Sequence, residues 1–164
     1  MAETYSTQYT AGFLAVPPGH TYAYGGGVRS FPFDYTQVLA GAAGDTILLM
    51  KAPPQCRILM ISSAFWWASF TATATLDLGW QAYVDMDGVT QAASAGGLLT
   101  ALLLTTDSTW SGGMLLTSTP DDSKPVVNRK VFNNRDPVTI FATIGVAAPG
   151  VGATLNGHLM VVTP

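Results

Sequence analysis

The sequence predicts an all-β protein, an antiparallel β-sandwich that is jelly-roll-like, with one short helix and an extended N-terminal arm. Three observations support this fold class. Seven or eight apolar segments of strand length follow one another at short spacing. Several of them alternate apolar and polar residues, as strands with one buried face do. Gly, Pro, Asn and Asp gather between these segments, as at the turns of a sandwich.

Residues 1–44 are predicted to form the arm, because Gly and Pro at the density found there break regular elements. The segment is rich in aromatic residues, unlike a disordered tail, so we expect it to order on a partner. Aromatic side chains bury a large area at low entropic cost. The alternative is a loop-rich first part of the same domain that wraps its own core. The proposed contact residues are Tyr5, Tyr9, Phe13, Tyr22, Tyr24, Phe31 and Phe33.

The folded domain is expected over residues 45–164, and it begins with a strand at 45–51 that two prolines end. Its centre is the stretch from Cys56 to Trp80. The apolar run 56–61 suits a strand covered on both faces. The segment 71–80 alternates cleanly, which predicts a half-buried strand. Its core-facing residues would be Ala72, Ala74, Leu76, Leu78 and Trp80.

An aromatic step, Phe65-Trp66-Trp67, lies between these two strands. Adjacent residues of a strand point to opposite faces, so Trp66 and Trp67 cannot both fill one core layer. One of them would then face outward, towards a partner subunit, a sugar or the arm. The alternative is a strand end at which the chain bends and both indoles are buried. Trp66 and Trp67 are therefore candidate partner-binding residues.

The second half of the chain supplies the remaining elements. Asp87-Gly88 predicts a turn. Leucines at helical spacing in 98–104 predict the one short helix. Strands are expected at 114–117, 126–132, 138–146 and 153–161. We expect the last two to form a hairpin that ends at the C-terminus, and a jelly roll would arrange all strands in two four-stranded sheets.

The composition indicates a protein that is buried in an assembly. Only 10% of the residues are charged, whereas about 25% are charged in ordinary soluble domains. No apolar run approaches the ~18–20 residues that span a bilayer, so we expect no membrane association. The uncharged surface is then expected to lie against other chains.

Other partners and compartments are not indicated. The seven basic residues are scattered, so we expect no nucleic-acid partner. The first residues lack the basic and apolar regions of a signal peptide, which predicts synthesis in a cytoplasm.

No residue pattern indicates catalysis, and we predict a non-enzyme without cofactor or metal. The single cysteine, Cys56, is expected to be a buried thiol. His20 and His158 have no partners at ligand spacing. The segment Asp85-Met86-Asp87-Gly88 is similar to the start of a calcium loop. About nine residues further on, where such a loop needs Glu, the chain has Ala and Ser, so a turn explains the aspartates better.

The order of elements resembles that of one class of viral proteins. A Gly- and Ala-rich extended segment precedes an apolar strand that ends in proline at 48–54, and a long apolar strand follows at 57–61. Then come Thr75-Leu76-Asp77-Leu78-Gly79, a short leucine-rich helix and the closing hairpin. This layout resembles the small structural proteins of tailed-bacteriophage heads, in particular jelly-roll capsid decoration (cement) proteins.

The resemblance implies a virion protein on the outer surface of an icosahedral shell, made in the host cytoplasm. Such a protein clamps neighbouring major capsid proteins and associates with itself, as a homotrimer or, in the less favoured alternative, a homodimer. No catalytic residues are implied. Two alternatives remain open: a carbohydrate- or receptor-binding sandwich that uses Trp66, Trp67 or Trp110, and a tail or neck component of the same virus class.

Overall fold

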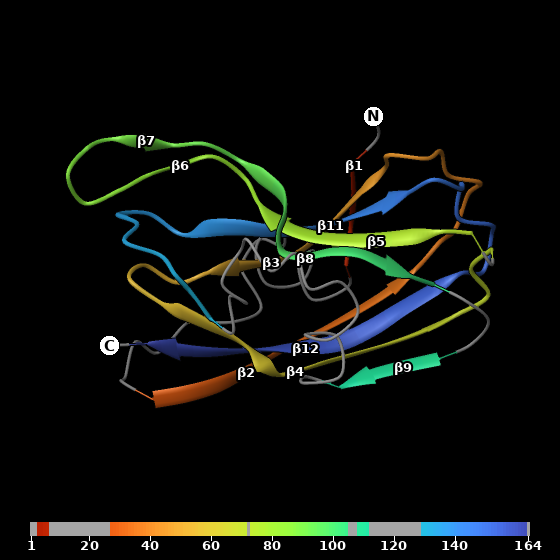
Figure 1. The fold of residues 1–164 in the computed structure, drawn as a ribbon, viewed down its shortest axis with the longest axis horizontal. Helices are drawn as coiled ribbons and strands as arrows, with labels where there is room; N and C mark the ends of the chain where they lie inside the picture. The colour runs from red at the N-terminus through yellow and green to blue at the C-terminus, as the bar shows by residue number, and fades with distance from the viewer. Residues whose placement is uncertain (1–2, 7–26, 72, 105–107, 112–128, 164) are drawn as a thin grey trace, which may run out of the picture.

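The computed structural model describes residues 3–6, 27–71, 73–104, 108–111 and 129–163, and it folds them into two sheets that face each other (Figure 1). The first sheet contains, in spatial order, β1 (Glu3–Tyr5), β3 (Thr46–Ala52), β11 (Val138–Gly145), β5 (Thr75–Trp80) and β8 (Ser94–Leu103). The second sheet contains β2 (Gly27–Thr36), β12 (Thr154–Thr163) and β4 (Arg57–Ala68). Two short strands pair with β4: β10 (Arg129–Val131) pairs with its first part, and β9 (Ser108–Ser111) pairs with its last part. A small ribbon, β6 (Tyr83–Val84) and β7 (Thr90–Gln91), lies at the left end of the view in Figure 1.

The connectivity is that of a jelly roll. Apart from the short β1 and β10, the sheets have the orders β3-β11-β5-β8 and β2-β12-β4-β9. Successive strands alternate between the sheets, except β5 and β8, which are neighbours. Strands from the two ends of the chain lie side by side, since β2 and β12 pair from Thr36 beside Thr154 to Gly27 beside Thr163. The predicted all-β, jelly-roll-like sandwich is therefore confirmed.

The core lies between the sheets and follows the alternation that the sequence shows. In β12, Leu155, Leu159 and Val161 are fully buried, and Asn156, His158 and Met160 lie on the outer face. In β5, Leu76 and Leu78 are buried as predicted. Ala74 just before it is also buried and Trp80 packs against the core, while Ala72 lies outside the described residues. The predicted buried thiol is confirmed as well, and burial raises the pKa of Cys56 to about 12.

The predicted helix at 98–104 is wrong, because this segment belongs largely to β8. Leu99 lies opposite Leu78 of β5, and Leu102 lies opposite Leu76. Leu102 is buried while Leu103 is 49% exposed, so burial alternates where the strand ends. A short leucine run has no decisive periodicity of its own, and pairing with β5 determines its structure.

The predicted hairpin of the last two strands is also wrong. β11 pairs with β3 and β5 in the first sheet, whereas β12 pairs with β2 and β4 in the second. Each strand already has two neighbours, so neither has an edge left for the other. The connection 146–153 instead crosses from one sheet to the other.

Parts of the predicted arm pack on the domain itself. Residues 27–36 form β2, a full strand of the second sheet. Residues 3–5 run parallel to the start of β3, and Ser6 Oγ donates a hydrogen bond to the Leu49 carbonyl oxygen at 2.9 Å. Residues 3–6 and 27–36 therefore fit the alternative stated above, in which the first part of the chain packs on the core of its own domain. Residues 7–26 and the strand predicted at 114–117 lie outside the described residues. The arm over 7–26 and the strand at 114–117 therefore stay predictions.

Candidate functional site

Strand β4 places Trp66 and Trp67 on opposite faces of the second sheet. Trp67 is 5% exposed and belongs to the core, whereas Trp66 is 43% exposed. Trp66 is paired within the sheet, opposite Asn156 of β12 and Thr109 of β9, so it does not lie at a frayed strand end. The prediction that one indole faces outward is confirmed, and the outward one is Trp66.

A bulge in β4 decides which indole is outside. Leu59 lies opposite Met160 and Ala64 opposite His158, so four residues of β4 face a single residue of β12. The three extra residues are an odd number, and an odd insertion exchanges the inner and outer faces of everything that follows. The buried Ser63 hydroxyl fills the gap, because it donates to the Leu59 carbonyl oxygen at 2.9 Å and accepts from the Met160 N–H at 3.1 Å.

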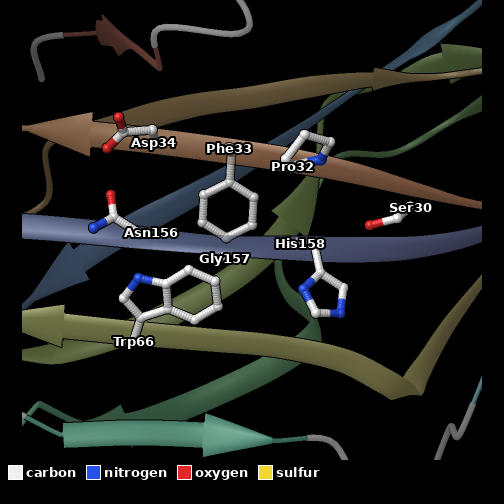
Figure 2. A pocket seen from close by; sticks show the side chains of 8 residues that line it. All are labelled: Ser30, Pro32, Phe33, Asp34, Trp66, Asn156, Gly157 and His158. Atoms are coloured by element: carbon white, nitrogen blue, oxygen red, sulfur yellow. The ribbon is translucent and has the colours of Figure 1, made fainter.

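Trp66 forms one wall of a shallow pocket of about 430 Å³ on the outer face of the second sheet (Figure 2). Three adjacent strands supply the lining. Asp34, Asn156 and Trp66 form one cross-strand row, and Pro32 and His158 belong to the next row. In Figure 2 the indole lies between Asn156 and His158. The remaining lining residues are Ser30, Phe33 and Gly157.

Two polar groups of the pocket, Asn156 and Asp34, are held by a hydrogen bond between them. The side-chain amide of Asn156, oriented to satisfy its neighbours, donates to the Asp34 carboxylate and to the Leu155 carbonyl oxygen at 3.2 Å. Among the described lining residues, Asp34 is the only one that carries a charge. Together with Ser30 and His158, these side chains offer hydrogen-bond donors and acceptors around one apolar ring.

The floor of the pocket is part of the core. A Cβ atom at Gly157 would lie 2.3 Å from the Ala64 carbonyl oxygen and 2.8 Å from Cζ of Phe33, so only glycine lets these strands approach as closely as they do. The Phe33 ring packs there, with its centroid 5.6 Å from that of Phe65. The backbone beneath Trp66 is therefore closely packed.

A second surface, which we call the apolar loop end, lies where the β2–β3 and β11–β12 connections meet, at the right of the view in Figure 1. The Gln37 N–H donates to the Ala153 carbonyl oxygen at 2.8 Å, and the Gly41 N–H donates to that of Pro149 at 3.2 Å. Residues 37–44 and 145–153 contain no charged side chain. Four large side chains are exposed there: Val38 (77%), Leu39 (76%), Val146 (75%) and Val151 (67%).

Two solved structures with a similar fold are phage capsid structures. No protein-family model and no curated protein matches the sequence. A chain in the structure "Capsid of Ralstonia phage GP4" matches with a TM-score of 0.65 at 17% identity, over 99% of this chain and 99% of that chain. A chain in "Cyanophage Pam1 capsid asymmetric unit" matches with a TM-score of 0.53 at 12% identity, over 88% of this chain and 91% of that one. The chain shares its fold with these capsid chains.

The structure separates the predicted partner-binding residues. Trp66 and Tyr5 are each 43% exposed, on different sheets. Phe33 and Trp67 are buried, and Phe31 is partly buried against the core. The side chains of Tyr9, Phe13, Tyr22, Tyr24 and Trp110 lie outside the described part of the structure.

The apolar loop end was not found from the sequence. Its loops are Gly- and Ala-rich and indicate only turns, and the fold brings together two stretches from opposite ends of the chain. Their lack of charge was the available signal.

The other groups that sequence reasoning singled out serve structure. Asp85 accepts hydrogen bonds from the Asp87 N–H at 3.1 Å, the Val89 N–H at 2.8 Å and Gln91 Nε2 at 2.8 Å, and these bonds hold the pKa of the Asp85 carboxyl below its usual value. They shape the predicted turn. Among the described residues, no group of three or more His, Cys, Asp or Glu could hold a metal ion, and His20 lies outside them. The same residues include no helix that could span a membrane.

Proposed function

We propose that this chain is a virion structural protein, a capsid decoration (cement) protein that binds the outside of a phage head and stabilises contacts between major capsid proteins. The observation that carries the proposal is the fold match to a chain of the Ralstonia phage GP4 capsid over 99% of both chains. The small number of charged residues supports it, because permanent interfaces lack charge at their centres. The role we propose needs contact area and no reaction.

The apolar loop end is the surface that we assign to the shell contact. Its four exposed aliphatic side chains make a patch of the kind that marks a protein interface. Burying a side chain of this kind contributes about 1.5–3 kcal/mol, so four contribute about 6–12 kcal/mol. Association costs about 4–15 kcal/mol, which is of the same size. One copy would therefore bind weakly, and a homotrimer that presents three loop ends would bind by avidity.

The test uses purified protein and heads of the virus that encodes it. The double variant V38S/L39S changes two exposed residues of the apolar loop end. We expect at least tenfold lower occupancy of the heads at an unchanged melting temperature. The matched control, V28S/V131S, changes two valines that are 59% and 51% exposed at the other end of the second sheet, and it should bind like the wild type.

Two outcomes contradict the proposal. Full occupancy by V38S/L39S removes the apolar loop end from the shell contact. Electron micrographs of labelled virions that locate the protein at the tail or neck would show that it is a tail or neck component and not a decoration protein.

A further inference from the structure

We propose that the pocket around Trp66 binds a neutral saccharide. This activity is additional to the decoration role, and it uses the outer face of the second sheet rather than the apolar loop end.

The first argument is the position of the indole. Trp66 stands on β4, which is paired on both sides there, and its side chain is still 43% exposed. A pyranose ring has a face of C–H groups with a slight positive charge, which packs on the electron-rich face of an indole. Trp66 therefore presents the apolar plate that a sugar ring requires.

The second argument is the chemistry around the indole. Sugar hydroxyls both donate and accept hydrogen bonds, so their site needs short polar side chains of both kinds. Asn156 and His158 flank the indole, and Asp34 and Ser30 line the pocket from β2 (Figure 2). At about 430 Å³ the pocket has the size of a small-molecule site, which usually measures about 300–1,000 Å³.

The lining disfavours other ligands. A proline-rich peptide docks in a groove lined by several aromatic side chains. Among the described residues that line this pocket, Trp66 is the one exposed aromatic residue. An anionic sugar would be placed beside the Asp34 carboxylate, which carries a like charge. A neutral sugar meets neither obstacle.

The third argument is the rigid support of the pocket. The Asn156 amide is held by Asp34, and the floor at Gly157 is packed against Phe33 and β4. The Ser63 bonds fix the bulge that turns Trp66 outward. Because little has to be ordered on binding, the entropic cost is low.

The experiment is a glycan array that carries neutral oligosaccharides of glucose, galactose, mannose and N-acetylglucosamine beside sialylated ones. The strongest neutral hit is then titrated into the wild type and three variants. We expect Trp66→Ala to weaken binding at least tenfold and Asn156→Ala several-fold. The matched control is Tyr5→Ala, because Tyr5 is equally exposed but lies on the first sheet, and it should leave binding unchanged. Melting curves show that each variant is folded, and Asn156→Ala decides the matter if Trp66→Ala does not fold.

Three results overturn the proposal: no neutral glycan binds, the hits are sialylated glycans alone, or binding survives both Trp66→Ala and Asn156→Ala. If Trp66→Ala abolishes head binding and the array is empty, the pocket is a capsid contact and the saccharide site is refuted. Because head binding is tested through V38S/L39S, the decoration role and the saccharide site can fail independently.

Discussion

Replacing Trp67 and Trp66 by Ala, one at a time, tests how the bulge in β4 sets the faces of the strand. Trp67 is 5% exposed in the core. Its truncation removes the transfer free energy of the indole and leaves a cavity between the sheets, so the free energy of unfolding should fall by about 3–5 kcal/mol. Trp66 is 43% exposed, and its loss leaves a dent that water fills rather than a cavity.

The expected loss for Trp66→Ala follows from its covered area. An aromatic side chain buries about 150–250 Å² when fully covered, so somewhat more than half of this amounts to about 100 Å². At about 25 cal/mol per Å² the loss is at most about 2.5 kcal/mol, because area counts of this kind are upper bounds. We therefore expect Trp67→Ala to be the more destabilising change by at least about 0.5 kcal/mol.

The measurement is urea unfolding followed by far-ultraviolet circular dichroism, which does not depend on the indole that each variant lacks. Both variants should keep the wild-type denaturant slope. If Trp66→Ala destabilises the protein as much as Trp67→Ala or more, the exchange of faces at the bulge is wrong. Trp67 would then not be the core residue.

Two further predictions concern close packing and pH. Gly157→Ala should lower the free energy of unfolding by about 1–3 kcal/mol, because its Cβ would collide with the Ala64 carbonyl oxygen. Gly150→Ala, where a Cβ meets no atom within 4 Å, is the control, and equal melting temperatures would contradict the packing argument. Hydrogen bonds lower the pKa of Asp85 in the folded state, so its carboxylate stabilises the fold above pH about 4, and this contribution is lost as the pH falls through the folded-state pKa. Asp85→Asn should thus be less stable than the wild type at pH 7, and it should lose less stability than the wild type below pH 4. Curves of unfolding free energy against pH that run parallel for the two proteins from pH 7 to pH 2 would refute this role of the ionised carboxylate.

Local pattern determined much of the fold. Alternation in 71–80 correctly identified Leu76 and Leu78 as buried residues of β5, because the side-chain period of a strand is a property of the strand itself. The turn at Asp87-Gly88 also followed from the sequence, whereas the described residues form twelve strands rather than the predicted seven or eight. The prediction of an exposed indole at Trp66 or Trp67 had the same local basis.

The choice of neighbours was not a local property. The leucine run 98–104 is largely strand because β5 offers it an edge, and β11 and β12 lie in different sheets because each has two other partners. Residues 27–36, read as an arm, form a strand because β12 pairs with them along their whole length. The pairing between segments that are far apart in the sequence decides these cases, and the residues of one segment alone do not specify its partner.

The two candidate surfaces show the same division. The sequence by itself determined that the connections 37–44 and 145–153 carry no charge. It predicted an outward indole at Trp66 or Trp67 only as one of two alternatives, the other being that both are buried. Only the tertiary structure decided that Trp66 is the outward indole, because an odd insertion opposite β12 exchanges the faces of β4. It also joined the two uncharged connections into one apolar loop end, because the pairing of β2 with β12 brings them to the same end of the sandwich.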